Sequence, residues 1–228
     1  MTDLFFKFPS TPHLAVLGDN DIRGDKILLP AEQAQCLRHK LVIEEKVDGA
    51  NLGISFDSDG NIHAQNRGAY LTLPGSGQWQ RLGEWLEPRM DAFFEHLTDR
   101  YILFGEWCYA RHSVSYDRLP DWFLGFDIYD KKEGRFLSVD RRDAFLSRLG
   151  ITRVPVIAEG HFSLQELEKL FTQSRFSDQP MEGLYLRFDK DGWLEQRAKL
   201  IRPAFIQAIT EHWSRLAIQP NRLDVRVN

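Results

Sequence analysis

The chain has 228 residues, 43% of them hydrophobic, which is enough to bury a sizeable core. A net charge of −4 argues against a protein that coats long stretches of nucleic acid through overall positive charge. The sequence has no apolar run long enough to cross a bilayer and no signal-peptide pattern at its start, so we expect no membrane contact and a cytoplasmic setting.

Cysteines and histidines give no sign of a disulfide framework or a transition-metal site. Cys36 and Cys108 are too few and too far apart for either, so we predict two free thiols. The seven histidines lack HExxH or HxxxH spacing. No Pro/Gly/Ser-rich linker, repeat or low-complexity tract divides the sequence, and we therefore treat residues 1–228 as one domain.

The first predicted elements are an irregular lead-in, a short helix and a small sheet. Prolines and glycines punctuate the chain before residue 25, and Pro30 is well suited to begin a helix. Three β-rich stretches follow, at residues 40–46, 52–56 and 61–66. Asp-Gly pairs separate them, which is typical of antiparallel strands joined by tight turns.

The middle of the chain alternates helices and strands. Residues 78–97 carry hydrophobic side chains at helical spacing, and Pro88 should kink or divide that helix. We expect strands at residues 100–107 and 121–130. A helix near Asp140 should end at Gly150, because glycine accepts the left-handed conformation common after helices.

The C-terminal part predicts two short helices and a hairpin. Ser163 and Glu166 form an S-x-x-E capping box. Residues 183–188 and 193–201 should pair around an Asp-Gly turn, and a final amphipathic helix is expected over residues 203–216. The fold class is therefore α+β, with mostly antiparallel sheets.

The string EEKVDGAN, residues 44–51, places Lys46 after an apolar strand and before a glycine turn. By itself Lys-x-Asp-Gly is a weak signal, because an exposed hairpin turn also favours Asp-Gly. Five further sequence strings make the Lys-x-Asp-Gly signal more specific. They are QNRG around Arg67, LFGEW around Glu106, FDIY from Phe126, MEGLYLR around Glu182 and QRAKLIR around Lys199.

These six motifs, in this order and over most of the chain, resemble those of ATP-dependent RNA ligases of the RNA ligase 2 type. The resemblance implies an α+β adenylyltransferase domain of the ATP-grasp-like ligase type, with flanking helices and a nucleotide pocket between antiparallel sheets. It also implies that residues 1–228 form a single nucleotidyltransferase domain. The stretch after Lys199 is short, so we expect neither an OB-fold nor the helical C-terminal domain of other ligases.

The resemblance makes Lys46 the residue that takes AMP from ATP. A lysine amine is normally protonated, so a nucleophilic lysine needs a pKa depressed by partial burial or by neighbouring cations. Arg197 and Lys199 share one face of a predicted strand, and we expect them to supply those cations and to neutralise the α-phosphate. Arg197 stands where family members often have lysine, so proton transfer to the leaving pyrophosphate would fall to Lys199.

The other motif residues are expected to bind ATP and Mg²⁺. Glu182 would hold Mg²⁺ directly or through water. Glu106 resembles the carboxylate that binds ribose, Phe126 the ring that stacks on adenine, and Arg67 would grip ribose or phosphate. The same motifs add Glu45, Asp48, Gly49 and Asn51 to the nucleotide-binding set. In the alternative interpretation Phe126 is a core residue and the two glutamates are merely solvated.

Together these features predict an ATP- and Mg²⁺-dependent RNA ligase that joins 5′-phosphate and 3′-hydroxyl RNA ends through lysyl-AMP and an adenylylated RNA 5′ end. An end-processing kinase or phosphatase would be a partner. RNA contact should be local, through Arg67 and the basic segment from Arg187 onward. Two alternatives stay open, a GTP-dependent capping-type guanylyltransferase and a non-catalytic module that binds nucleotides or RNA ends.

Overall fold

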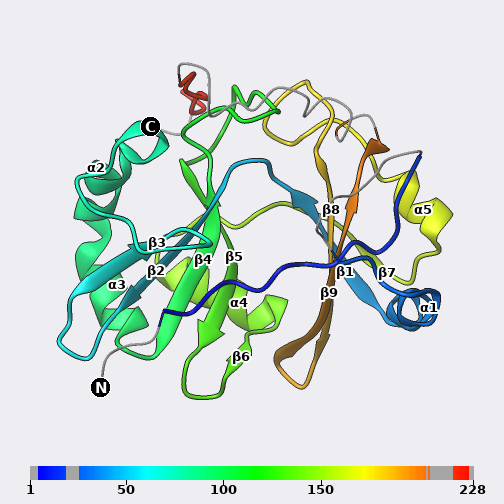
Figure 1. Cartoon of the computed structure of the whole chain (residues 1–228), viewed down its shortest axis with the longest axis horizontal. Coiled ribbons are helices and arrows are strands. Elements are labelled where there is room, and N and C mark those ends of the chain that lie inside the picture. The colour runs from blue at the N-terminus through cyan, green and yellow to red at the C-terminus, as the bar shows by residue number, and fades with distance from the viewer. Residues whose placement is uncertain (1–4, 19–25, 204, 206–217, 226–228) are drawn as a thin grey trace.

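The computed structural model describes residues 5–18, 26–203, 205 and 218–225, and two antiparallel sheets lie side by side in it (Figure 1). One sheet has four strands in the order β7 (Val156–Gly160), β1 (Leu41–Lys46), β8 (Gly183–Lys190) and β9 (Trp193–Ile201). The other has five strands in the order β3 (Ile62–Gln65), β2 (Ala50–Phe56), β4 (Tyr101–Trp107), β5 (Phe123–Asp130) and β6 (Arg135–Phe136). The predicted α+β class with antiparallel sheets is confirmed.

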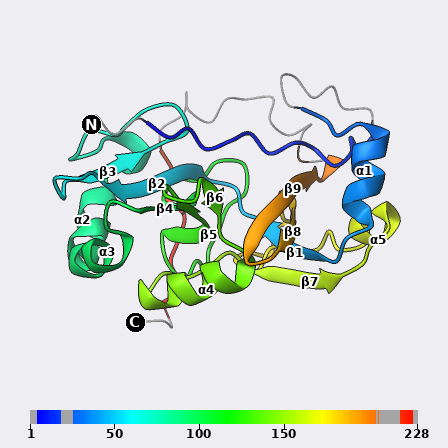
Figure 2. The same cartoon turned by 90° about the horizontal axis from the view of Figure 1, so that it is seen from below.

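Short helices flank both sheets. The core of the five-stranded sheet includes side chains of α2 (Leu82–Leu86) and α3 (Met90–Leu97), and that of the four-stranded sheet includes side chains of α1 (Pro30–Leu37) and α5 (Leu164–Glu168). The N-terminal segment crosses one side of the molecule and α4 (Val139–Arg148) lies on the opposite side (Figure 2). Among the described helices, none combines the length and apolar character that crossing a membrane requires.

The chain passes from one sheet to the other between β1 and β2. Ile43 is buried in the core of the four-stranded sheet and Ile54 in that of the five-stranded sheet. The predicted tight turn between paired strands at Asp48-Gly49 is therefore wrong, because β1 and β2 belong to different sheets. Glycine is still required at position 49, since a Cβ there would lie 2.7 Å from the backbone oxygen of Trp107.

Most of the other predicted turns and helix ends are confirmed. The Asp59-Gly60 turn joins β2 to β3, which pair. Pro88 lies in a 3₁₀ turn, η2 (Glu87–Arg89), that separates α2 from α3. Gly150 follows α4 with φ of 64°, the left-handed conformation expected there.

The C-terminal hairpin and capping box are also confirmed. β8 and β9 pair around Asp191 and Gly192, which have φ of 52° and 80°. Ser163 accepts a hydrogen bond from the Glu166 N–H at 3.3 Å, and Glu166 accepts one from the Ser163 N–H at 2.8 Å. Strands β6 and β7 were not predicted, and the expected final helix over residues 203–216 lies almost wholly outside the described residues. Both cysteines are buried free thiols, as predicted.

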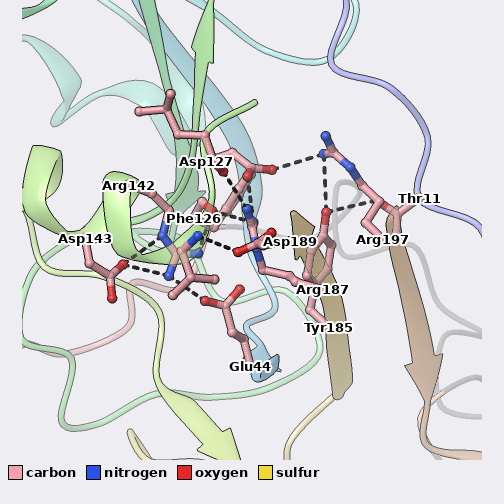
Figure 3. Close-up of polar contacts among 12 residues, drawn as sticks. Thr11, Glu44, Phe126, Asp127, Arg142, Asp143, Tyr185, Arg187, Asp189 and Arg197 are labelled. Atoms are coloured by element: carbon pink, nitrogen blue, oxygen red, sulfur yellow. Dashed lines mark hydrogen bonds and ion pairs between the residues drawn. The ribbon is translucent and has the colours of Figure 1, made fainter. Parts of the chain in front are cut away.

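Buried ion pairs connect the two sheets (Figure 3). Arg187 on β8 pairs with Asp127 on β5 at 2.6 Å, and neither side chain is exposed. Behind them Arg142 on α4 pairs with Glu44 on β1 at 2.6 Å, again with both side chains fully buried. Both arginines also donate to the backbone oxygen of Phe126, Arg142 at 2.9 Å and Arg187 at 3.1 Å. The strand that carries Phe126 is thereby fixed to the four-stranded sheet and to α4.

Candidate active site

A cavity of about 860 Å³ lies between the sheets, and strands of both contribute to its wall. This is where a nucleotide pocket was predicted. Most predicted site residues line it, namely Glu45, Lys46, Gly49, Asn51, Arg67, Glu106, Phe126, Glu182 and Lys199. Asp48 and Arg197 do not belong to the wall.

Lys46 is the last residue of β1, so the sheet directs its side chain into the cavity. Its Nζ lies 2.6 Å from Oε1 of Glu182, the residue immediately before β8. Burial alone lowers the pKa of Lys46, but nearby carboxylates, chiefly Glu182 and Glu106, outweigh burial and raise it. The expectation that neighbouring cations depress the pKa is thus wrong for the protein alone, because carboxylates surround the amine.

Two carboxyl groups beside Lys46 also have raised pKa values. Burial raises the pKa of Glu106 to about 8 and that of Glu182 to about 7, although the positive charge of Lys46 opposes both shifts. Carboxyl groups with pKa values this high and a lysine at hydrogen-bond distance are typical of functional sites rather than of solvated surface residues. The interpretation of these glutamates as merely solvated is therefore not favoured.

Two residues that line the cavity, Glu182 and Asn51, each have an oxygen that is unpaired within the described part of the chain and of a type that binds divalent cations. Oε2 of Glu182 and Oδ1 of Asn51 are buried and accept no hydrogen bond from any residue that the structure describes. Buried polar atoms are ordinarily paired, and carboxylate and amide oxygens are preferred ligands of Mg²⁺. Asn51 also faces Glu106 across the β2–β4 pair. The residues present are thus suited to hold Mg²⁺ beside Lys46.

Phe126 and Phe8 contribute aromatic rings to the cavity wall. Phe126 lies on β5 with its ring only partly buried, and Phe8 of the N-terminal segment packs against it with ring centroids 5.4 Å apart. Arg67 lies after β3 and is exposed at the cavity wall. Aromatic rings and a lysine-carboxylate cluster in the wall of one cavity match the two chemical halves of a nucleotide.

The two basic residues of β9 have different surroundings. Lys199 lines the cavity, and the N-terminal segment holds its backbone in place: its N–H donates to Pro12 and its oxygen accepts from the Leu14 N–H, at 2.9 and 2.8 Å. Arg197 instead donates to Asp127 at 3.0 Å and lies over the ring of Phe136 at 4.1 Å. The position of Arg197 therefore does not support the expected contact with the α-phosphate.

Two acidic residues of the first motif, Glu45 and Asp48, accept hydrogen bonds from neighbouring loops. The Glu45 carboxylate accepts hydrogen bonds from the Ser174 hydroxyl and from the Arg175 N–H. The Asp48 carboxylate accepts from two consecutive backbone N–H groups, those of Ser113 and Val114, at 2.7 and 2.8 Å. Asp48 is thus occupied by the loop after β4, while its charge still acts on Lys46.

Sequence reasoning missed several residues of the cavity wall. They are Phe8, Thr11, His13, Asn66, Gln78, Trp79 and Tyr185. His112 lines the cavity too and has a ring nitrogen 3.0 Å from Oε1 of Gln78. Most of these come from segments outside the motifs, and only the folded chain brings them to the cavity.

Comparison with solved structures finds the same fold in the RNA ligase of Naegleria gruberi. One structure, a mutant with ATP and Mn, matches with a TM-score of 0.59 and 16% identity over 78% of this chain and 54% of that chain. A second, with pyrophosphate, matches with a TM-score of 0.59 and 22% identity over 77% and 54%. A third, a mutant with AMP and Mn, matches with a TM-score of 0.59 and 15% identity over 91% and 59%. This chain thus spans about half the length of these relatives.

Sequence comparisons give the family. No curated protein is significantly similar to this chain. The model of the RNA ligase family, however, matches residues 39–201, a stretch that contains all six motifs from Lys46 to Lys199 and ends with β9. Because this match covers well over half of the sequence and agrees with the fold, the chain belongs to the RNA ligase family.

Proposed function

We propose that this protein is an ATP-dependent RNA ligase in which Lys46 is the nucleophile that becomes adenylylated. The observation that carries the proposal is the position of Lys46, with its Nζ 2.6 Å from Glu182 in the cavity that Lys199 also lines. Family membership supports the reaction class. The solved relatives that hold ATP, AMP or pyrophosphate support ATP as the nucleotide.

The reaction has three steps, each with a balanced exchange of bonds. First, the Lys46 amine attacks the α-phosphorus of ATP; a P–N bond forms, pyrophosphate leaves and the amine loses a proton. Second, an oxygen of the RNA 5′-phosphate attacks lysyl-AMP; a P–O bond forms, the P–N bond breaks and Lys46 regains a proton. Third, the RNA 3′-hydroxyl attacks the activated 5′-phosphate, loses its proton, and AMP leaves.

The cavity residues divide between the two ends of ATP. Phe126 would stack on the base, Glu106 would accept hydrogen bonds from the ribose hydroxyls, and Arg67 would bind ribose or phosphate. Lys199 would neutralise charge on the α-phosphate and protonate the leaving pyrophosphate. We infer that Arg197 acts indirectly, by holding Asp127 beside Phe126.

Asn51 and Glu182 would hold Mg²⁺ through the oxygens that are otherwise unpaired. When bound, Mg²⁺ supplies positive charge that offsets both the phosphates and the carboxylates around Lys46. Glu182 meanwhile keeps the Lys46 amine pointed into the cavity through their 2.6 Å contact. Glu45, Asp48 and Gly49 keep the chain around Lys46 in place, through the loops that they anchor and the close approach to β4.

We further infer that residues 1–228 work as a single nucleotidyltransferase domain of the RNA ligase 2 type in the cytoplasm. Support comes from the cavity itself, whose wall needs both sheets and the N-terminal segment. The substrate would be RNA with 5′-phosphate and 3′-hydroxyl ends. Ends of other chemistry would need a kinase or phosphatase before sealing.

Sealing assays with two kinds of RNA test the proposal. Wild-type protein with ATP and Mg²⁺ should seal 5′-phosphorylated RNA that has a 3′-hydroxyl end. Lys46→Ala should fail on this substrate but should still seal RNA whose 5′-phosphate is already adenylylated, because the third step does not use the amine. The matched control is Lys40→Ala, an exposed lysine at the other end of the same strand region, which should seal like wild type.

Two results would contradict the proposal. Sealing of ordinary RNA by Lys46→Ala at the wild-type rate would show that another residue is the nucleophile. Sealing of all-DNA ends as fast as RNA ends would remove RNA as the preferred substrate, since a site for RNA should read the ribose 2′-hydroxyl.

A further inference from the structure

Three aromatic residues, Phe8, Phe126 and Tyr185, line the cavity, and Thr11 of the N-terminal segment lines it beside Tyr185. Asp127, next to Phe126 in the sequence, pairs with Arg197 at 3.0 Å and with Arg187 at 2.6 Å. Aromatic rings with a nearby hydroxyl suit a nucleobase, whose faces pack on rings and whose edge needs a few directed hydrogen bonds.

A chain of hydrogen bonds leads from Asp127 to Thr11 (Figure 3). Nη1 of Arg197 donates to Asp127 at 3.0 Å and to the hydroxyl of Tyr185 at 3.3 Å. The Tyr185 hydroxyl lies 3.5 Å from Oγ1 of Thr11. Thr11 is almost completely buried, with 7% of its surface exposed.

One direction in this chain is fixed by chemistry: a guanidinium can only donate, so the Tyr185 oxygen accepts from Arg197. Tyr185 has one proton, and within the described residues its remaining hydrogen-bond partner is Thr11. In the arrangement where Tyr185 donates to Thr11, the Thr11 oxygen accepts and the proton of Thr11 is left for a group in the cavity.

We propose that the Thr11 hydroxyl is a specificity-determining donor that binds N1 of adenine. This rests on the proposed function, in which the cavity binds ATP. N1 of adenine is an acceptor, whereas N1 of guanine or hypoxanthine carries a proton; N3 and N7 accept in all three bases and do not distinguish them. A hydroxyl whose proton points outward complements adenine, and a mismatched base would leave a buried polar group unpaired.

The test is a series of adenylylation assays with ATP and its 1-deaza, 3-deaza and 7-deaza analogues, each of which replaces one ring nitrogen by C–H. For wild type, the 1-deaza analogue should raise KM about 3- to 10-fold, the effect of one lost neutral hydrogen bond. Thr11→Val should raise KM for ATP by a similar factor with kcat unchanged, and should show no further loss with that analogue. Thr11→Ser keeps the hydroxyl and should behave like wild type.

Two further variants separate the proposal from a structural effect. Tyr185→Phe keeps the ring but removes the hydroxyl that links Arg197 to Thr11, and it should weaken the response to the same analogue. Thr172→Val, at an exposed threonine outside the cavity, should change nothing.

The inference is overturned if wild type uses 1-deaza-ATP as well as ATP, if Thr11→Val still shows the wild-type response to this analogue, or if Tyr185→Phe retains the full response. Failure of the proposed function would look different, because wild type would then take up no label from ATP.

Discussion

At the scale of single residues, Phe126 belongs both to the core, through its backbone, and to the cavity wall, through its ring. Its backbone oxygen accepts hydrogen bonds from two buried arginines, while its ring borders the cavity and contacts Phe8. The backbone is therefore held by the core while one face of the ring stays available. This arrangement combines the two interpretations that the sequence left open for Phe126, and it leads to a prediction.

Phe126→Leu should weaken ATP binding by about 1–3 kcal/mol, the range for loss of base–aromatic stacking. KM for ATP in lysine adenylylation, with a thermal melt to check folding, measures the effect. Phe94→Leu is the control, because Phe94 is 56% exposed on α3 and away from the cavity wall. Unchanged ATP affinity in a folded Phe126→Leu protein would return this residue to a purely structural role.

Asp57, at the end of β2, gives a prediction on acid stability. Hydrogen bonds from His63 and Asn61 hold the pKa of this carboxyl well below its ordinary value of 3.8. A folded pKa below the unfolded one adds stability above about pH 4, and that stability is lost as the pH falls toward the folded pKa. The difference in unfolding free energy between wild type and Asp57→Asn should therefore shrink as the pH is lowered from 6 to 3. A difference that is constant over this range would contradict the account.

At the scale of elements, buried ion pairs connect the two sheets. Removing one partner of a buried ion pair leaves an uncompensated charge, whereas an exposed pair contributes little. Arg187 has no exposed side-chain surface and pairs with Asp127, while Arg135 on β6 is 42% exposed and pairs with Glu195.

Arg187→Met should therefore lower the free energy of unfolding by about 3–5 kcal/mol. Arg135→Met should lower it by less than about 1 kcal/mol. Urea denaturation of the two variants beside wild type measures both values. Similar losses for the two would mean that the buried pair does not hold the sheets together.

Local signals predicted those elements that depend on neighbouring residues. The Ser163 cap, the end of α4 at Gly150 and the β8–β9 turn each follow from side chains within a few positions. The connection at Asp48-Gly49 did not follow, because the same dipeptide serves a hairpin or a crossing between sheets. β7 was missed because it is a half-buried edge strand, defined mainly by its pairing with β1.

The site divides in the same way between motif and non-motif residues. The motifs located Lys46, Glu106 and Glu182, since each lies on or next to a strand whose pattern is visible in the sequence. Thr11 and His13 could not be found, because they belong to an irregular segment whose place beside β9 depends on long-range backbone hydrogen bonds. Likewise, the raised pKa of Lys46 results from carboxylates on other strands.

At the scale of the whole molecule, both sheets contribute residues to the proposed active site. The four-stranded sheet carries Lys46 on β1 and Lys199 on β9, with Glu182 just before β8, and the five-stranded sheet carries Glu106 and Phe126. Neither sheet alone would form the cavity. The N-terminal segment completes it by contacting Phe126 at one end and β9 at the other.

Labelling of the covalent intermediate identifies the nucleophile. The protein is incubated with α-labelled ATP and Mg²⁺, denatured and digested, and the labelled peptide is identified by mass spectrometry. We expect AMP to be attached to Lys46 through a bond that acid cleaves and alkali does not, and we expect Lys46→Ala to take up no label while Lys40→Ala does. Label on another residue, or full labelling of Lys46→Ala, would contradict this assignment.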